Sequence, residues 1–177
     1  IDAGIPHHAI TYLYRDKLKS LWIGTDGGGL LRMRGGVFST LPGGNGLVSG
    51  SVYPIYEDRE GSLWVGTADG GLHQLRDSKF ITFTEQDGLS DNSIHCAYED
   101  RGGTLWLGSD NGLNRLKQGK IMPPVYAKAD PLRKRVLSLF EDRAGSLWIG
   151  TRGGLLKRKN GKTAGFTTKD GLSDNTI

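Results

Sequence analysis

The chain has 177 residues, a length that one domain can account for, and nearly one residue in six is glycine, well above the usual ~7%. It has no apolar run of 18 residues that could span a membrane. It also has no charged-then-apolar leader sequence, although a mature or excised domain would lack one too. Its single cysteine excludes an internal disulfide and a cysteine-based metal site. The net charge of +4 is uneven, because residues 1–116 carry −4 and residues 117–177 carry +8, and a basic end can attract anionic partners.

One sequence unit occurs four times along the chain. A tryptophan recurs every 42 residues, within SLWIGT, SLWVGT, TLWLGS and again SLWIGT. Charged residues precede each copy, and a leucine follows each glycine-containing turn. A fixed period of this length is typical of solenoids and propellers. The tryptophans are Trp22, Trp64, Trp106 and Trp148.

The second unit, residues 52–84, shows the predicted elements in chain order. Short runs rich in Val, Ile, Tyr, Phe, Trp and Thr alternate with turns that contain Gly or Asp, which indicates strands joined by hairpins. No helical i, i+3, i+4 pattern of useful length occurs, so the chain is predicted to be all-β. The four expected strands are VYPIYED, SLWVGT, GLHQLR and KFITFT.

Four antiparallel strands in about 42 residues, repeated, indicate a β-propeller blade. We expect one propeller segment over residues 1–177, with four blades of four antiparallel strands and linkers between them. Four blades is the low end for a propeller and no blade is shared between the two ends, so we expect part of a ring of seven or eight blades. Missing repeats, or self-association with a second copy, would complete it. The expected blades are residues 10–41, 52–84, 94–125 and 136–168, with inner strands starting at Ile10, Val52, Ile94 and Val136.

The unit also predicts where individual side chains lie. Each tryptophan is expected to pack between blades, and the glycine two residues later, such as Gly108, is expected to leave room for a neighbouring side chain or a bent strand. Cys96, in an apolar strand pattern, is expected to fill the core rather than act as a nucleophile. His73, in a third strand, is expected at the surface.

Two predictions concern the third unit. The dipeptide Asn111-Gly112 suits a two-residue turn with positive φ at both positions. The fourth strand is expected over residues 120–125, which contain Pro123 and Pro124. Because proline cannot donate to a strand ladder, this strand has to be the outer edge of its blade.

Residues 87–116, DGLSDNSIHCAYEDRGGTLWLGSDNGLNRL, closely resemble the two-component regulator propeller repeat, and residues 170–177, DGLSDNTI, begin the motif again. The resemblance covers all four units. It implies a β-propeller sensor domain, periplasmic and part of a bacterial membrane receptor, with a kinase or diguanylate cyclase output domain in the full-length protein. It also implies a link to carbohydrate-responsive regulation. No enzymatic activity and no cofactor are expected.

The linkers between blades depart from the intact motif and form the predicted ligand site. DGLSDN is intact at residues 87–92 and 170–175, where Asp and Asn are expected to satisfy loop backbone groups. Residues 45–50 read NGLVSG, residues 2–7 read DAGIPH, and residues 129–135 read ADPLRKR. Many propellers bind ligands on the face that such linkers form. The expected ligand-binding residues are His7, His8, Tyr53, His95, Arg133, Lys134 and Arg135.

Three cations, Arg133, Lys134 and Arg135, replace a neutral capping segment of the intact motif. Arginine can hold a carboxylate through two charge-assisted hydrogen bonds, and nearby aromatic and imidazole rings offer a sugar a flat surface. An acidic oligosaccharide, such as a uronate, is therefore favoured over a neutral one. Nucleic acid is not expected, because the rest of the chain is net negative and has no basic stripe. The alternative is that these cations pair with the acidic neighbouring blade.

Other kinds of site receive less support. A metal site would need His7, His8 and His95 to converge with carboxylates, and no metal is expected. The Glu-Asp-Arg triplets recur in three blades, whereas a catalytic pair occurs once, so they are interpreted as turn chemistry or interblade pairing. Three function classes stay open. They are a ligand-sensing receptor module, which is favoured, a protein-interaction propeller without a small-molecule ligand, and a propeller hydrolase or lyase.

Overall fold

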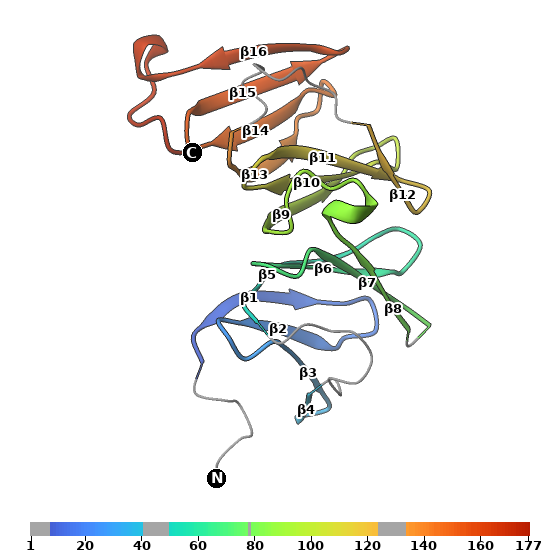
Figure 1. Ribbon diagram of the computed structural model, residues 1–177. Helices are drawn as coiled ribbons and strands as arrows, with labels where there is room; N and C mark the ends of the chain where they lie inside the picture. The colour runs from blue at the N-terminus through green and yellow to red at the C-terminus, as the bar shows by residue number, and fades with distance from the viewer. Residues whose placement is uncertain (1–7, 41–49, 78, 124–133) are drawn as a thin grey trace. The chain divides into compact units, whose positions relative to one another are not determined.

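The computed structural model describes residues 8–40, 50–77, 79–123 and 134–177. The chain divides into two compact units. Unit 1 comprises Ile1–Thr84 and Asn92–Ile94, and unit 2 comprises Glu85–Asp91 and His95–Ile177. The regular elements of the described residues are strands, apart from two short 3-10 helices, so the all-β prediction is confirmed (Figure 1).

Unit 1 contains two four-stranded antiparallel sheets, ordered β1-β2-β3-β4 and β5-β6-β7-β8. Each strand pairs with the next one in sequence, as expected for hairpins separated by short glycine-containing turns. The strands are β1 (Ile10–Arg15), β2 (Leu21–Thr25), β3 (Leu30–Arg34), β4 (Val37–Thr40), β5 (Val52–Glu57), β6 (Leu63–Thr67), β7 (Leu72–Arg76) and β8 (Lys79–Phe83).

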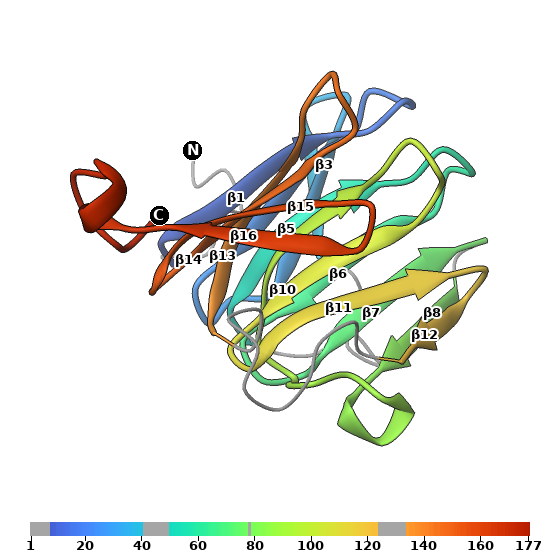
Figure 2. The ribbon, with the colours of Figure 1, turned by 90° about the horizontal axis from the view of Figure 1, so that it is seen from above.

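Unit 2 repeats this plan with sheets ordered β12-β11-β10-β9 and β13-β14-β15-β16. A short helix precedes the first sheet, and another follows β16 near the C-terminus (dark red in Figure 2). The elements are η1 (Glu85–Asp87), β9 (Ile94–Glu99), β10 (Leu105–Ser109), β11 (Gly112–Lys117), β12 (Lys120–Met122), β13 (Val136–Glu141), β14 (Leu147–Thr151), β15 (Gly154–Lys159), β16 (Lys162–Phe166) and η3 (Thr168–Asp170).

The turns between third and fourth strands are the two-residue turns with positive φ at both positions. Gln118 and Gly119 have φ values of 51° and 72°, and Asn160 and Gly161 have 49° and 78°. This geometry matches the right-handed twist of the strands that it joins. The Asn-Gly signal therefore marks the outer hairpin of the fourth blade.

The prediction of the same kind of turn at Asn111-Gly112 is wrong. Gly112 pairs with Ser109 as the first residue of β11, so the loop residues are Asp110 and Asn111. Only Gly112 has a positive φ, of 122°. The turn is displaced by one residue towards the N-terminus, and this displacement places the Asp110 side chain on the loop.

Two apolar cores form between successive blades, one in each unit. The unit 1 core contains Trp22, Leu30, Val52, Ile55, Leu63 and Val65, and the unit 2 core contains Trp106, Leu113, Val136, Leu147, Ile149 and Leu156. Each core draws on two sheets, so packing of the tryptophan between blades is confirmed for Trp22 and Trp106. Cys96 packs against the unit 2 core, and burial raises the pKa of its thiol to about 12, as expected of a core residue.

The glycine two residues after each tryptophan makes room for the start of the next inner strand. A Cβ atom at Gly108 would lie 2.6 Å from Cγ1 of Val136, and one at Gly24 would lie 3.0 Å from Cγ1 of Val52. Real Cβ atoms essentially never approach other atoms more closely than 3.0 Å. The clearance predicted for Gly108 is thus confirmed, and it is used by Cys96 of the same blade, whose Sγ would lie even closer to the added Cβ, and by Val136 of the following blade.

His73 is fully buried, so its predicted surface position is wrong. It lies in the first half of β7, where both Leu72 and His73 are inaccessible to solvent. Its Nδ1 lies 3.0 Å from Oγ1 of Thr82, and burial lowers the pKa of His73 to about 4, so the ring is neutral at pH 7. A polar residue in a third strand did not indicate exposure, because a sheet covered on both faces buries successive residues.

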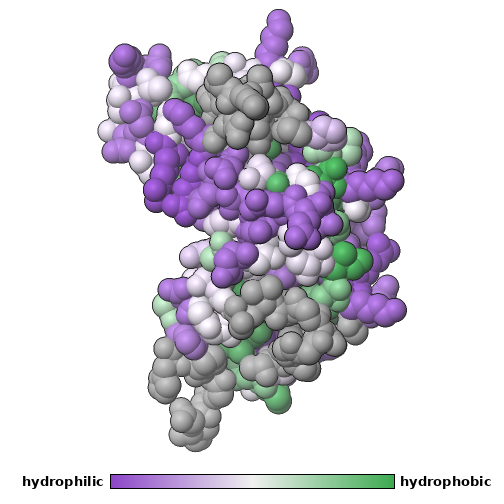
Figure 3. All heavy atoms as spheres, viewed as in Figure 1, coloured by the Kyte–Doolittle hydropathy of each residue, from purple (hydrophilic) through white to green (hydrophobic). Residues whose placement is uncertain are grey.

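The outer strand of the third blade is shorter than predicted. β12 ends at Met122, and Pro123 follows it, while residues 124 and 125 lie outside the described residues. β12 is nevertheless the edge strand of its sheet, as the prolines required. Residues of the outer strands also contribute exposed hydrophobic surface, including Ile81 of β8 and Met122 of β12. The face seen in Figure 3 is otherwise mainly hydrophilic.

Candidate functional site

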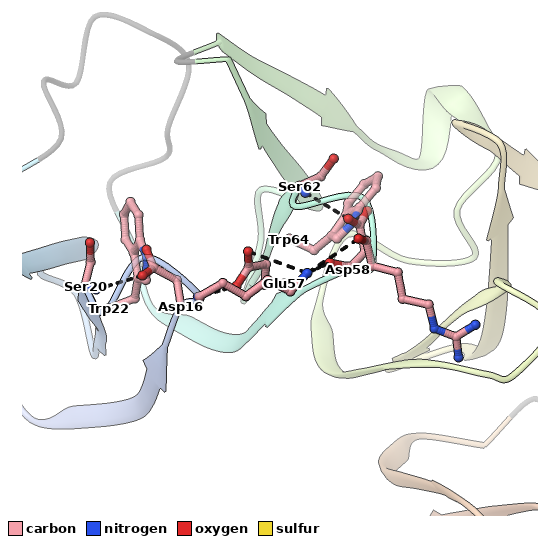
Figure 4. Close-up of polar contacts among 9 residues, drawn as sticks. Asp16, Ser20, Trp22, Glu57, Asp58, Ser62 and Trp64 are labelled. Atoms are coloured by element: carbon pink, nitrogen blue, oxygen red, sulfur yellow. Dashed lines mark hydrogen bonds and ion pairs between the residues drawn. The ribbon is translucent and has the colours of Figure 1, made fainter.

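One end of each blade is built in the same way four times. An aspartate that follows the inner strand accepts a hydrogen bond from the backbone N–H of the residue four positions later. Its second oxygen accepts one from the indole Nε1 of the blade's tryptophan (Figure 4). We call this arrangement the aspartate clamp. The Nε1–Oδ2 distances for Asp16, Asp58, Asp100 and Asp142 are 2.8, 2.8, 2.7 and 2.9 Å.

The aspartate clamp uses the charge of the carboxylate for structure. The N–H groups of Ser146 and then of Trp148 hold the pKa of Asp142 down, at about 2. The ionised carboxylate closes the loop between first and second strands and orients the tryptophan for packing. A carboxylate held in this way is a poor candidate for acid–base catalysis at neutral pH, which needs a pKa near the working pH.

The residue after the clamp aspartate joins the blade to the next one. The backbone N–H of Lys17 donates to Oε2 of Glu57 at 2.9 Å, and that of Arg101 donates to Oε2 of Glu141 at 3.0 Å. Both cationic side chains also donate to backbone carbonyls of the same neighbouring loop. The interpretation of the charged triplets as turn and interblade contacts is therefore confirmed.

The opposite end of the blades, which we call the linker end, is held by backbone hydrogen bonds and, in each blade, by a Thr or Ser hydroxyl at the end of the second strand that donates to a carbonyl of the following turn. It contains the linkers before the inner strands and the turns between second and third strands. The N–H of Gly29 donates to the carbonyl of Gly50 at 3.0 Å, and that of Gly71 to the carbonyl of Asn92 at 2.8 Å. Because these two backbone bonds involve no side chain, the other side chains of the linker end can differ from blade to blade.

In unit 2 the linker end brings His95 and Arg135 onto the same oxygen of Asp110. His95 Nε2 lies 2.6 Å, and Arg135 Nε 2.5 Å, from Oδ1 of Asp110. The two nitrogens are 3.1 Å apart. One Nε2 atom cannot donate to Asp110 and accept from Arg135 at once, so we assign its proton to the Asp110 bond. The shared carboxylate oxygen holds both donors side by side.

Two further cations stand beside this cluster. The side chain of Lys134 lies over Gly153, where a Cβ atom would come within 2.7 Å of Cε. The backbone N–H of Arg152 donates to the carbonyl of Arg135 at 3.2 Å, and the Arg152 residue is exposed. Lys134, Arg135 and Arg152 thus lie at the same linker end, where Arg135 pairs with Asp110, and their positive charge favours an anionic ligand.

Unit 1 has different chemistry at its linker end. Ser51 Oγ donates to Oδ1 of Asp26. His8 is exposed and its ring lies beside Gly28, where a Cβ would be 2.6 Å from Cδ2. Tyr53 is half-buried in β5. These predicted residues lack the arginine and lysine that accompany His95.

Of the predicted ligand-binding residues, the structure brings His95, Lys134 and Arg135 together in unit 2. His8 and Tyr53 belong to unit 1. His7 and Arg133 lie outside the described residues. The sequence analysis omitted Asp110 and Arg152. Aligning the units on the position after the second strand would have found them, since that position is occupied by Asp26, Ala68, Asp110 and Arg152.

The second intact linker motif has the expected structural role. The side chain of Asn175 accepts the backbone N–H of Thr168 at 2.8 Å, and that of Asp174 accepts the N–H of Thr176 at 2.6 Å. Capping of loop backbone groups by Asp and Asn is confirmed there.

Among the residues that the structure describes, no three His, Cys, Asp or Glu side chains are grouped so that they could hold a metal ion. No helix in the same residues combines the length and apolar character needed to cross a membrane.

Comparison with known proteins gives a family match over more than half of the chain. The model of the two component regulator propeller matches residues 4–27, 46–69, 88–111 and 132–153. No curated protein sequence matches the chain significantly.

Solved structures share the fold. The extracellular domain of the hybrid two-component system BT3049 from B. thetaiotaomicron matches 100% of this chain with a TM-score of 0.86 and 27% identity. That of BT4673 from the same organism matches 90% with a TM-score of 0.70 and 25% identity. The chain spans only 25% and 24% of those two chains. The four sheets are therefore blades of a larger propeller.

Virginiamycin B lyase from Staphylococcus aureus also has a similar structure. It matches 92% of this chain with a TM-score of 0.70, and this chain covers 57% of the lyase. The two sequences are 14% identical, so the similarity concerns the fold alone.

Proposed function

Because the chain belongs to the two-component regulator propeller family, we propose that it is part of the ligand-sensing module of a bacterial membrane signalling receptor. Its similarity to extracellular domains of hybrid two-component systems supports this proposal. In such a receptor the propeller faces the periplasm. A kinase or diguanylate cyclase output domain on the other side of the membrane responds to ligand binding.

The proposed ligand is a carbohydrate, with an acidic oligosaccharide such as a uronate favoured. The observation that carries this choice is the cation cluster at the linker end of unit 2, which consists of Lys134, Arg135 and Arg152 and in which Arg135 pairs with Asp110. Arg135 uses Nε for Asp110, and its two Nη groups form a planar fork suited to a ligand carboxylate.

The exposure of the cluster suits a site that opens to solvent. The side chain of His95 is 12% exposed, whereas those of Arg135 and Asp110 are 31% and 40% exposed. Asp110 positions His95 and Arg135 before any ligand arrives, which lowers the entropic cost of binding.

Calorimetry with oligogalacturonides and with neutral galactose oligomers of the same length tests this proposal. We expect the acidic series to bind, and Arg135→Ala to weaken binding about tenfold or more, as expected for loss of a charge-assisted bond. Lys162→Ala, which removes an exposed cation of β16, is the matched control and should leave affinity unchanged. Equal binding of both series, or binding unchanged in Arg135→Ala, would exclude this site.

The same measurements separate the other function classes. Absence of saccharide binding, together with stable capture of a protein partner, would favour the interaction propeller. Turnover of an oligosaccharide that is lost on substitution of one acidic residue would establish a hydrolase or lyase.

We also propose that residues 1–177 act as one segment of four blades and that further blades, or a second copy, complete a ring of seven or eight. The exposed apolar side chains of β1 support this proposal, since Ile10 and Leu13 are 52% and 56% exposed whereas Val52 and Ile55 of β5 are buried. Sedimentation of the 177-residue chain tests whether a second copy supplies the missing blades. Concentration-dependent self-association that Leu13→Asp abolishes is expected if a second copy supplies the blades.

A further inference from the structure

Unit 2 contains a cleft of about 370 Å³ that lies away from its linker end. Its walls come from both sheets of the unit and include the first-to-second strand loops and the β15–β16 turn. The charged residues that line it are Asp100, Arg115, Glu141, Arg158 and Lys159. The cleft therefore belongs to the end of the blades where the aspartate clamps lie.

Arg115 is the feature of the cleft that sets it apart from the equivalent place in other blades. In the first blade Arg32, which lies over Trp22, donates Nε and Nη2 to Oγ of Ser20 at 3.1 and 3.0 Å. In the second blade the equivalent Gln74 donates to Oγ of Ser62 at 3.0 Å. In these two blades the long polar side chain has an acceptor within its own sheet, whereas in the fourth blade the equivalent Lys157 lies over Trp148 and Oγ of Ser146 has no hydrogen-bond partner among the described residues.

The third blade lacks this hydrogen bond, although Thr104 carries a hydroxyl as the serines do. Thr104 stands in the place of the serine, and Nε of Arg115 is buried without a hydrogen-bond partner in the described part of the chain. Nη2 of Arg115 donates to the carbonyl of Pro123 at 3.1 Å, and the guanidinium lies 5.8 Å from the centre of the Trp106 ring. A buried donor of a charged group without an acceptor is costly, so the site favours an incoming acceptor.

The carboxylates that line the cleft do not supply an acceptor for Arg115. Both oxygens of Asp100 accept N–H groups, from Thr104 at 2.9 Å and from Trp106 at 2.7 Å. Oε2 of Glu141 accepts the N–H of Arg101 at 3.0 Å. Arg115 and Lys159 form no ion pair with any residue that the structure describes. The carboxylates of the cleft thus already accept hydrogen bonds from backbone and indole N–H groups, whereas its cations Arg115 and Lys159 can still pair with an anion.

We propose that this cleft binds a small oxyanion, held by Arg115 and Lys159. The shared chemistry is a carboxylate, sulfate or phosphate group, which arrives either as a free inorganic ion or as a substituent of an acidic saccharide. The site is separate from the cation cluster at the linker end and does not depend on the function proposed for that cluster.

Calorimetric titration of the 177-residue chain with sodium sulfate, sodium phosphate and sodium glucuronate, at ionic strength held constant with chloride, tests the proposal. Saturable binding of at least one of the three is expected. Binding of sulfate or phosphate identifies a free ion as sufficient, and binding of glucuronate alone identifies the saccharide source. No saturable binding of any of the three overturns the proposal.

Two variants identify the site. Arg115→Gln introduces the residue of the second blade and should weaken binding about tenfold or more, as expected for a charge-assisted pair. Thr104→Ser introduces the serine of the first two blades and removes the γ-methyl group that restricts the threonine rotamer. We expect its hydroxyl to accept from Arg115 as Ser20 does from Arg32, which should weaken anion binding and raise the midpoint of urea unfolding.

Lys120→Ala removes an exposed cation of β12 and serves as the control that should bind as the original chain does. Affinity unchanged in both Arg115→Gln and Thr104→Ser, or lowered as much by Lys120→Ala, would overturn the proposal. Because Thr104→Ser is expected to stabilise the chain, its loss of binding cannot be ascribed to unfolding.

Discussion

The two ends of the blades are made by the same strands, yet they relate to the repeat in opposite ways. At the aspartate-clamp end, the same carboxylate makes the same two bonds in all four blades. At the linker end, the position after the second strand is an acid in two blades, an alanine in one and an arginine in one. Bonds that every blade needs for folding keep their residues, and specific chemistry is confined to positions that backbone bonds already hold.

The largest effect is expected from removing the tryptophan that the clamp orients. Trp64→Ala and Trp106→Ala should each lower the free energy of unfolding by about 3–5 kcal/mol, because each leaves a large cavity. Urea unfolding measures this loss. Trp148→Ala is the comparison, and it should cost less because Trp148 is only partly buried. An unchanged midpoint for both Trp64→Ala and Trp106→Ala would contradict the core assignment.

A direct comparison of the two ends uses one aspartate from each, within the same blade. Asp100→Ala should cost about 2 kcal/mol, since it leaves the indole and a loop N–H without their acceptor. Asp110→Ala should cost less than about 1 kcal/mol, since it removes contacts with partly exposed side chains. Thermal or urea unfolding of both variants checks the order. Equal losses would show that the linker end is as structural as the clamp.

The clamp also predicts how stability responds to acid. The pKa of Asp142 is lowered in the folded chain to about 2, below the ordinary value near 4. A lowered folded-state pKa adds stability that is complete above about pH 4 and disappears as the pH falls towards 2. The unfolding free energy of Asp142→Asn should therefore differ from that of the original chain above pH 4, and the gap should narrow between pH 4 and 2. A gap that stays constant would show that the charge of Asp142 contributes nothing.

The smallest effect on stability is expected from converting one linker into another. Lys134→Asn with Arg135→Ser introduces the residues Asn92 and Ser93 of the preceding linker. We expect the free energy of unfolding to change by about 0.5 kcal/mol or less, as for surface substitutions, while binding of an acidic oligosaccharide is lost. Unfolding curves and calorimetry on the same preparation separate the two readouts. A large loss of stability would mean that these cations hold the blade together.

Much of the fold was predictable because the same weak sequence signals for strands and turns occur in all four units and support one another. One tryptophan followed by Gly two residues later is ambiguous, but four copies at a fixed spacing predict the strands, their order and the packing of Trp22 and Trp106. His73 shows where the argument fails. Local polarity predicts exposure only where one face of a sheet meets solvent, and β7 lies in a region that is covered.

The candidate site was predictable only in part, because its geometry depends on which residues form each turn, and an error of one residue changes which side chains meet. His95, Lys134 and Arg135 were identified from departures of the linker from its motif. Asp110, which joins two of them, was missed because the Asn-Gly signal placed the turn one residue too late. The unpaired Nε of Arg115 was also beyond prediction, since Thr104 carries a hydroxyl as the serines do and only the placed side chains show that the two residues form no hydrogen bond.

The glycine clearance has a consequence for how such proteins grow. Within each unit, the glycine on one blade, Gly24 or Gly108, makes room for the valine that begins the next blade, Val52 or Val136. This contact is head-to-tail, because the earlier blade of each unit supplies the glycine and the later blade supplies the valine. Heterologous joints of this kind close into a ring if the rotation per joint divides a full circle, and otherwise wind on as an open helix. The rotation angle between successive blades therefore determines how many blades close the ring. Duplication or loss of a whole blade leaves the contacts between the remaining blades unchanged.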